Sequence, residues 1–300
     1  MLRRCSANPI VTRNDFPAVT SVFNPGAIKI GDRYLLMLRV QLRSRETVLY
    51  IAESSDGVQF SISAEPVKLH GIESVNERIF HVYDPRITKI DSTYYVMFAM
   101  DTESGCKLGL AESSDMKEFI FKGIVSEEEN RNGVLFPELI NGRYMRLDRP
   151  NKTDVADVKS GSAIWLSESE DLLNWKPVGE VAKGNLHYWD ELIGAGPPPV
   201  KTDKGWLLVY HDIALHYQPI YQVGVMLLDL NDPTKVIARG KYNILEPQQM
   251  DEMVGQVPNV VFPSGMIVQD QRVMIYYGAA DTCVCMAETT IEELIDACFA

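Results

Sequence analysis

Six polar or charged residues stand at matching places in otherwise apolar segments: Asn24, Arg39, Asp84, Arg149, His211 and Asp281. Each one alone has an ordinary explanation. Asp84 followed by proline is typical of a turn, a single arginine in a strand is usually exposed, and a single histidine is usually a hydrogen-bonded core residue. Buried charge is costly unless it is paired or functional, so the recurrence of all six favours a shared site.

The residue types in this set suit chemistry on carbohydrate. Carboxylates transfer protons, arginine and asparagine bind hydroxyl groups or an anion, and aromatic faces stack on sugar rings. Cleavage of a glycosidic bond needs an acid together with a carboxylate base or an external nucleophile. Other chemistries fit less well, because the chain has no Ser-His-Asp order at suitable positions, and the segment GAGPPP lacks the strand and helix of a dinucleotide site.

The cysteines predict neither a metal site nor a disulfide framework. Cys283 and Cys285 are separated by one residue on one face of a strand, without a second Cys or His pair of zinc spacing. We therefore expect no metal and no organic cofactor, and we interpret the five cysteines as reduced thiols of a cytoplasmic protein. The first residues, MLRRCSANPIVTRNDF, contain no apolar stretch typical of a secretion signal.

Charge and hydropathy exclude some partners. The net charge of −12 argues against binding to nucleic acid or to an anionic membrane surface, since both need clustered Lys and Arg. No apolar run is long enough to span a bilayer. A small anionic ligand remains compatible with this charge because it needs only a few local cations.

The strongest signal in the sequence is a repeat. Five segments combine a short apolar strand, a turn rich in Gly, Asp or Asn, and a second apolar strand; they begin at Phe23, Tyr83, Leu135, Gly194 and Val257. Units of roughly 50–60 residues with about four strands each predict an all-β, five-bladed β-propeller. We expect a single catalytic domain over residues 1–300, with a short C-terminal helix in TTIEELIDACF that Thr290 caps.

Three of the units also share Ser, then Asp, then an aromatic residue, in LYIAESSDGVQF, LGLAESSDMKEF and IWLSESEDLLNW. No histidine accompanies these serines, so we predict structural turns in which the Ser and Asp side chains accept from backbone amides.

A propeller turns equivalent positions of its repeats into rings around one axis. The predicted inner-strand ring comprises Asn24-Pro25, Asp84-Pro85, Phe136-Pro137, Gly196-Pro197 and Pro258-Asn259. The predicted second-strand ring comprises Arg39, Asp101, Arg149, His211 and Asp281. Since a strand pair returns to the rim where it began, both rings should lie close together and form a polar funnel.

At these residues the sequence resembles glycoside hydrolase family 130, which contains inverting β-mannoside phosphorylases and β-mannosidases with a five-bladed propeller. The resemblance covers nearly the whole chain. It is carried by FNPGA, YDPRIT, NRNGVLFPELINGRY, RLDRPN, IGAGPPPVKTDKGWLLVYH, LLDLNDPTKVIAR, GQVPNVVFPSG and IYYGAAD.

The resemblance implies a role for each site residue. It makes Asp84 the general acid, which passes its proton through a mannose hydroxyl to the glycosidic oxygen while phosphate attacks from the opposite face. It places Asn24, Arg39, Tyr83 and Asp281 around the mannose that is transferred. It places Arg131, Asn132, Arg149, His211 and Tyr221 around the phosphate.

One departure from the family pattern bears on the reaction. Phosphorylases of this type often carry a lysine just before the IGAG segment, whereas this chain has HYWDELIGAG, with Glu191 and no lysine. The family's hydrolases are thought to replace phosphate-binding residues with glutamates, so Glu191, or Asp148 beside Arg149, could activate water. A surface position is the ordinary explanation for Glu191.

The leading interpretation is a cytoplasmic, reversible β-mannoside phosphorylase that uses inorganic phosphate on β-1,2- or β-1,4-linked manno-oligosaccharides. The alternative is an inverting exo-acting β-mannosidase with Glu191 or Asp148 as base. A third interpretation is a propeller that binds glycans without catalysis. A homo-oligomer is compatible with all three, and linkage and acceptor sugar are left open.

Overall fold

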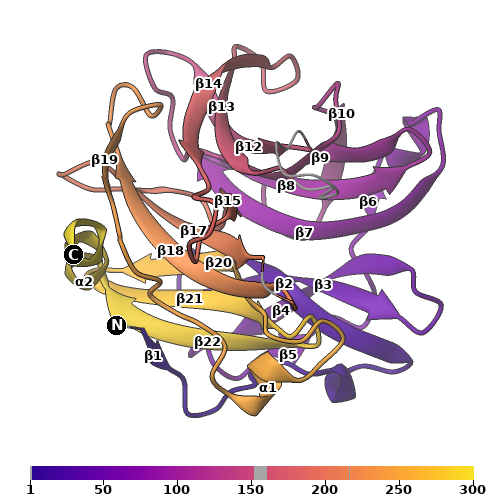
Figure 1. Cartoon of the computed structure of the whole chain (residues 1–300). Coiled ribbons are helices and arrows are strands. Elements are labelled where there is room, and N and C mark those ends of the chain that lie inside the picture. The colour runs from indigo at the N-terminus through magenta and orange to yellow at the C-terminus, as the bar shows by residue number, and fades with distance from the viewer. Residues whose placement is uncertain (1, 152–160, 216) are drawn as a thin grey trace.

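The computed structural model describes residues 2–151, 161–215 and 217–300. Its strands form five blades arranged around a centre, and the chain passes from one blade to the next in sequence order (Figure 1). The prediction of an all-β, five-bladed propeller with a short C-terminal helix is confirmed.

The first two blades are joined. Blade 1 comprises β2 (Val19–Ile30), β3 (Arg33–Leu42), β4 (Thr47–Ser54) and β5 (Ser61–Ile62). Blade 2 comprises β7 (Ile79–Ile90), β8 (Thr93–Thr102), β9 (Gly105–Ser113) and β10 (Phe119–Ile124), with β6 (Leu69–His70) parallel to β10. The two blades make one continuous sheet because β4 and β7 meet at a single parallel pair, Thr47 with His81.

The next two blades are separate sheets. Blade 3 comprises β11 (Asn130–Leu135), β12 (Tyr144–Pro150), β13 (Ala163–Ser169) and β14 (Lys176–Lys183). Blade 4 comprises β15 (Leu192–Ala195), β16 (Val200–Lys201), β17 (Trp206–Ala214), β18 (Ile220–Leu228) and β19 (Val236–Arg239). Within each blade the neighbouring strands run antiparallel.

The last blade closes the ring with the two ends of the chain. It comprises β20 (Val261–Gln269), β21 (Arg272–Ala279), β22 (Cys283–Thr290) and the N-terminal β1 (Arg3–Arg4), which lies beside β22 (Figure 1). Arg4 donates to the buried carboxylate of Glu252 at 2.7 and 2.8 Å, and Tyr277 donates to the same carboxylate at 2.8 Å. Glu252 lies in the short helix α1 (Met250–Met253), so the N-terminal strand is fixed to the blade 5 side of the ring.

Each strand contributes its two faces to two different cores, because successive side chains in a strand alternate. In β3, Leu35 and Met37 pack against blade 2, whereas Leu36 and Leu38 pack against blade 5. Three further apolar cores lie between blades 2 and 3, 3 and 4, and 4 and 5. The blades are therefore held face to face all around the ring.

Turns and the C-terminal helix follow the sequence predictions. Ser54 accepts from the amide of Gly57 at 2.9 Å, and Asp56 accepts from the amide of Val58 at 2.8 Å; blades 2 and 3 repeat this arrangement. The Ser-Asp motif is thus a structural turn, as predicted. Helix α2 (Ile291–Phe299) begins after Thr290, whose hydroxyl accepts from the amide of Glu293 at 3.1 Å.

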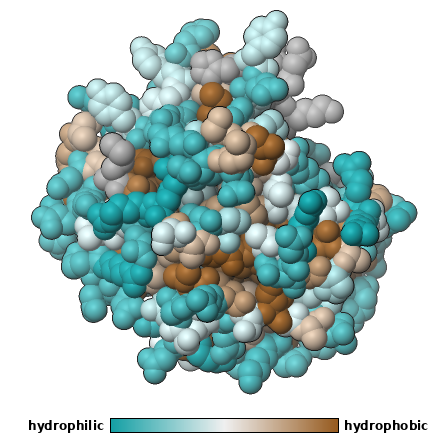
Figure 2. Space-filling view, turned by 90° about the horizontal axis from the view of Figure 1, so that it is seen from below, coloured by the Kyte–Doolittle hydropathy of each residue, from teal (hydrophilic) through white to brown (hydrophobic). Residues whose placement is uncertain are grey.

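The visible surface is mostly hydrophilic. Seen from below, the molecule is hydrophilic over most of its face, with several separate apolar patches (Figure 2). No helix in the described residues is both long and apolar enough to cross a membrane. All five cysteines are free thiols.

Candidate active site

Bulges in the inner strands aim polar side chains at the centre of the ring. The register with the second strand shifts between Phe23 and Gly26, between Tyr83 and Arg86, and between Arg131 and Val134. At these bulges Asn24, Asp84 and Asn132 adopt left-handed backbone conformations, with φ of 46°, 53° and 53°. Asn and Asp tolerate this conformation better than other non-glycine residues, and a bulge changes the direction of its side chain. The Asp84-Pro85 pair is therefore part of a bulge inside a strand.

The predicted inner-strand ring is wrong in blades 3 and 5. In blade 3 the counterpart of Asn24 and Asp84 is Asn132, because the bulge of this blade lies between Arg131 and Val134. Phe136 instead packs in the apolar core, with its ring 5.1 Å from that of Trp206. In blade 5 the bulge falls between Pro263 and Gly265, after the predicted Pro258-Asn259.

The carboxylate of Asp84 lies at the meeting point of blades 1 and 2. Its Oδ1 accepts from Asn24 Nδ2 at 2.9 Å and from Arg39 Nη1 at 2.8 Å. The side chain is only 11% exposed. Burial would raise the pKa of Asp84, but the charges of Arg39 and Arg86 and the two hydrogen bonds outweigh burial and lower the pKa.

Arg86 supports the bulge from inside the ring, a role that the sequence analysis did not assign. Its Nη1 donates to the carbonyl of Asp84 at 2.7 Å, and its Nε donates to the carbonyl of Gly196, in blade 4, at 3.1 Å. The guanidinium is fully buried, and burial lowers its pKa to about 10. The sequence signal for this role is the segment RIT after Asp84-Pro85, in which an arginine interrupts an otherwise apolar strand.

Tyr83 packs beside Arg39 on the same side of the site. The Arg39 guanidinium lies 4.6 Å from the centre of the Tyr83 ring and 4.3 Å from that of Phe23, a distance typical of cation–π contacts. The Tyr83 hydroxyl donates to Asp101 Oδ1 at 2.7 Å. Tyr83 therefore links the predicted mannose-binding residues to Asp101.

Arg149 and His211 form a buried pair across blades 3 and 4. Arg149 Nη1 lies 3.1 Å from His211 Nε2. Since arginine can only donate, Nε2 accepts, and the histidine is neutral. Burial and the Arg149 charge hold the pKa of His211 well below its ordinary value. Gly194 makes room for the pair, because a Cβ there would lie 2.5 Å from His211 Cε1 and 3.1 Å from Arg149 Cδ.

Arg131, Tyr221 and Asp281 lie close enough to the residues above to interact with them. Arg131 is directly opposite Arg149 in the β11–β12 pair. Burial raises the pKa of Tyr221, which also responds to the charges of Arg149 and Asp281. Burial raises the pKa of Asp281 to about 6; Arg39 opposes this shift and Asp84 adds to it.

The site holds an excess of buried positive charge. Four guanidinium groups each have a buried nitrogen without a hydrogen-bond partner among the described residues, namely Arg39 Nε, Arg86 Nη2, Arg131 Nε and Arg149 Nε. An unpaired buried donor is costly unless a ligand or water binds it. In a protein of net charge −12, four arginines beside three aspartates, Asp84, Asp101 and Asp281, still leave an excess of positive charge that suits an anion.

The two carboxylates considered as bases have structural partners elsewhere. Both oxygens of Glu191 accept backbone amides, from His187 at 3.0 Å and from Leu215. Asp148 is ion-paired to Arg146 at 2.6 Å and accepts from Ser167 at 2.5 Å. Because Asp148 and Arg149 are adjacent in β12, their side chains point to opposite faces of the strand.

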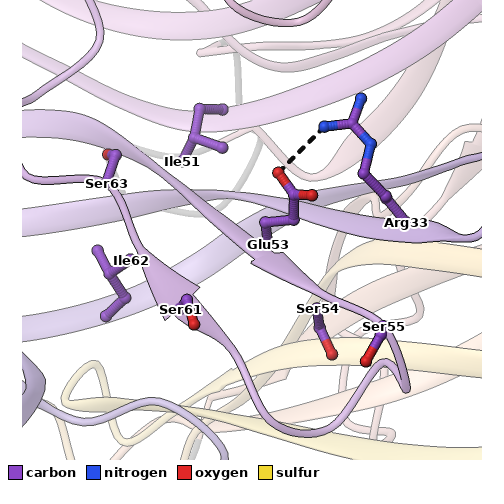
Figure 3. A pocket seen from close by; sticks show the side chains of 8 residues that line it. All are labelled: Arg33, Ile51, Glu53, Ser54, Ser55, Ser61, Ile62 and Ser63. Carbon is purple, nitrogen blue, oxygen red and sulfur yellow. Dashed lines mark hydrogen bonds and ion pairs between the residues drawn. The ribbon is translucent and has the colours of Figure 1, made fainter.

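A cavity outside this site lies at the outer edge of blade 1. It has a volume of about 420 Å³ and is lined by Arg33 and by residues in and next to β4 and β5 (Figure 3). Arg33 and Glu53 form an ion pair of 3.1 Å there, with both side chains more than 40% exposed. It contains none of the predicted site residues, so it is not the candidate active site.

The comparison with known protein families decides the assignment. Residues 2–299 match the family model described as beta-1,4-mannooligosaccharide phosphorylase, which is that of glycoside hydrolase family 130. The chain belongs to glycoside hydrolase family 130. The resemblance inferred from the motifs is confirmed, and family 130 proteins are enzymes of glycoside cleavage.

Individual relatives agree with this family. A 1,2-beta-oligomannan phosphorylase of Thermoanaerobacter sp. (strain X514) is 34% identical, over 98% of this chain and 98% of its own. A beta-1,4-mannooligosaccharide phosphorylase of Ruminococcus albus is 33% identical, over 98% of this chain and 89% of its own. The solved structure of a beta-1,2-mannobiose phosphorylase from Listeria innocua, in complex with beta-1,2-mannobiose, has a TM-score of 0.90 at 27% identity and covers 99% of both chains.

Proposed function

We propose that this family 130 protein is an inverting β-mannoside phosphorylase. It transfers the terminal mannose of a manno-oligosaccharide to inorganic phosphate, giving α-mannose 1-phosphate, and the reaction is reversible. The observation that carries the proposal is the cluster of buried arginine nitrogens without partners beside Asp84, since a phosphate ion would satisfy several of them. The relatives named as phosphorylases support the same reaction.

Asp84 acts as the general acid in this proposal. In the free site its pKa is low, because Arg39 and Arg86 favour the carboxylate. A phosphate anion bound nearby would raise the pKa of Asp84 and make a proton available. Family resemblance supplies the route, in which a mannose hydroxyl relays the proton to the glycosidic oxygen. The aglycone leaves with that proton as the phosphate oxygen bonds to the anomeric carbon.

The other site residues divide between two ligands. We assign mannose binding to Asn24, Arg39, Tyr83 and Asp281. We assign phosphate binding to Arg131, Asn132, Arg149, His211 and Tyr221. His211 contributes as the neutral acceptor that orients Arg149, since its Nε2 is already used by that arginine. Inorganic phosphate is the co-substrate, and the proposal requires no metal or organic cofactor.

Hydrolysis is the runner-up, and the contacts of its two candidate bases argue against it. Glu191 has both oxygens bound by backbone amides, and Asp148 is paired with Arg146 on the opposite face of the strand from Arg149. The missing lysine before IGAG is the observation that favours hydrolysis. A propeller that only binds glycans would have little use for the buried Asp84–Arg39 pair.

We further propose that the chain works as one catalytic domain over residues 1–300 in the cytoplasm. Five free thiols suit a reducing compartment. One relative is named for β-1,2 linkages and another for β-1,4 linkages, so both classes of manno-oligosaccharide are candidate substrates.

Product analysis tests this proposal. The protein is incubated with β-1,2- and β-1,4-mannobiose, with and without inorganic phosphate, and mannose 1-phosphate and free mannose are assayed. Phosphate-dependent formation of mannose 1-phosphate is expected from one linkage. Free mannose formed at the same rate without phosphate would identify a hydrolase. Binding without turnover would identify a glycan-binding propeller.

A further inference from the structure

Asp101 and Cys106 form a pair beneath the site that has no role in the reaction described above. They are directly opposite each other in the β8–β9 pair of blade 2. Both contact the hydroxyl of Tyr83, which lies 2.7 Å from Asp101 Oδ1 and 3.2 Å from Cys106 Sγ. Tyr83 is nearly buried, so these two residues determine where its hydroxyl end lies.

On one side, this pair leads to the mannose-binding residues. The ring of Tyr83 packs against the guanidinium of Arg39, which in turn donates to Asp84 at 2.8 Å. A change in the position of the Tyr83 hydroxyl would tilt the ring and move Arg39 relative to Asp84. Asp101 therefore helps to orient the acid without contacting it.

On the other side, the same pair leads to the phosphate-binding residues. Cys106 Sγ lies 3.4 Å from the carbonyl of Asn130, the residue before Arg131. The side-chain Oδ1 of Asn130 accepts the amide of Arg149 at 3.0 Å. The thiol thus contacts the segment that fixes both arginines proposed for phosphate.

We propose that Asp101 and Cys106 are positioning residues that connect the mannose and phosphate subsites, so that mannose and phosphate strengthen each other's binding. This inference rests on the proposed function. When mannose binds and orders Tyr83, the contacts through Asp101 and Cys106 also order the Asn130–Arg131 segment. Phosphate then binds with a smaller loss of conformational entropy. By thermodynamic linkage the effect is reciprocal.

Calorimetry on the full chain tests the coupling without requiring turnover. The dissociation constant of inorganic phosphate is measured alone and with saturating mannose. In the wild type, mannose should tighten phosphate binding at least about 5-fold, the lower end of typical coupling between sites. In Asp101→Asn, which keeps the shape but loses the charge, the tightening should fall below about 2-fold.

Three further variants identify the cause. Glu103→Gln removes the same charge at an exposed position near the end of β8 and should keep wild-type coupling. Cys106→Ala should lose coupling like Asp101→Asn, and Cys106→Ser should restore part of it, since a hydroxyl replaces the thiol. If Asp101→Asn fails to fold by circular dichroism, the two Cys106 variants decide the question.

The outcomes separate this inference from the proposed function. Coupling absent in the wild type, or unchanged in both Asp101→Asn and Cys106→Ala, would overturn the positioning role. A wild type that releases no mannose 1-phosphate would overturn the proposed function, whatever the calorimetry gives. In steady state, the positioning role also predicts that Asp101→Asn raises the KM for phosphate most at saturating mannoside. A general loss of structure would instead lower the rate at every mannoside concentration.

Discussion

Two aspartates of the site experience opposite environments. Arginine charges lower the pKa of Asp84, whereas burial raises that of Asp281 to about 6. In the free site Asp84 is therefore the carboxyl group that stays ionised, and its role as acid depends on bound phosphate raising its pKa, whereas Asp281 is protonated more easily. The two residues should therefore respond differently to substitution.

Replacing Asp84 with Asn should slow turnover strongly but keep binding. Loss of a general acid typically costs about 10²- to 10⁴-fold in rate, so kcat for phosphorolysis should fall by that factor. Phosphate affinity, measured by calorimetry, should be kept or increased because the arginines lose an opposing charge. Asp91→Asn, at an exposed turn of the same blade, is the matched control. Wild-type kcat in Asp84→Asn would contradict the assignment.

Asp281 should make mannose binding depend on pH. Because its pKa is raised to about 6, it is protonated below that pH and ionised above it. An ionised carboxylate accepts stronger hydrogen bonds from sugar hydroxyls, so mannose affinity should rise about 5- to 10-fold between pH 5 and 7. Calorimetry across this range tests the expectation, and Asp281→Asn should give a flat profile. A pH dependence that survives in Asp281→Asn would assign the titration to another group.

At the scale of the elements, the site depends on bulges and on one glycine. The repeat, the hairpins and the polar residues of blades 1 and 2 could be predicted, because Asn24-Pro25 and Asp84-Pro85 both mark their bulges in the sequence. The bulge at Asn132 could not be matched to those of blades 1 and 2 from the sequence, since β11 is short and Asn132 is not followed by proline. A bulge shifts the register by a residue, so a regular alignment of strands misplaces it.

Gly194 in β15 gives a prediction at this scale. A Cβ there would clash with His211 and Arg149, so Gly194→Ala should displace the pair and raise the KM for phosphate at least about 10-fold, equivalent to about 1.4 kcal/mol. The KM for the mannoside should change less. Gly179→Ala in β14 is the matched control, because the nearest atom to its Cβ would be 3.9 Å away. An unchanged KM for phosphate would mean that the pair does not bind it.

At the scale of the whole molecule, stability depends on how the ring closes. Arg4 of β1 neutralises Glu252, which is 1% exposed, so Arg4→Ala would leave a buried carboxylate without its cation. Loss of one partner of a buried pair costs about 3–5 kcal/mol, and thermal unfolding should move down by roughly 10 °C. The neighbouring Arg3 pairs with Glu293 at the exposed surface, and Arg3→Ala should shift the midpoint by no more than about 2–3 °C. Equal shifts in the two variants would contradict the role of the buried pair.

The same closure fixes the order in which the protein can be completed during synthesis. Arg3 and Arg4 leave the ribosome before the other strands of all five blades, whereas their strand partners, Ala287 and Glu288, are made only after blades 1 to 4. Until blade 5 begins to form, blade 1 has no neighbour on that side, and the apolar face formed by Leu36, Leu38 and Val40 stays uncovered. A nascent chain stalled before β20 therefore presents an open ring, with an apolar blade face that chaperones or other chains can bind.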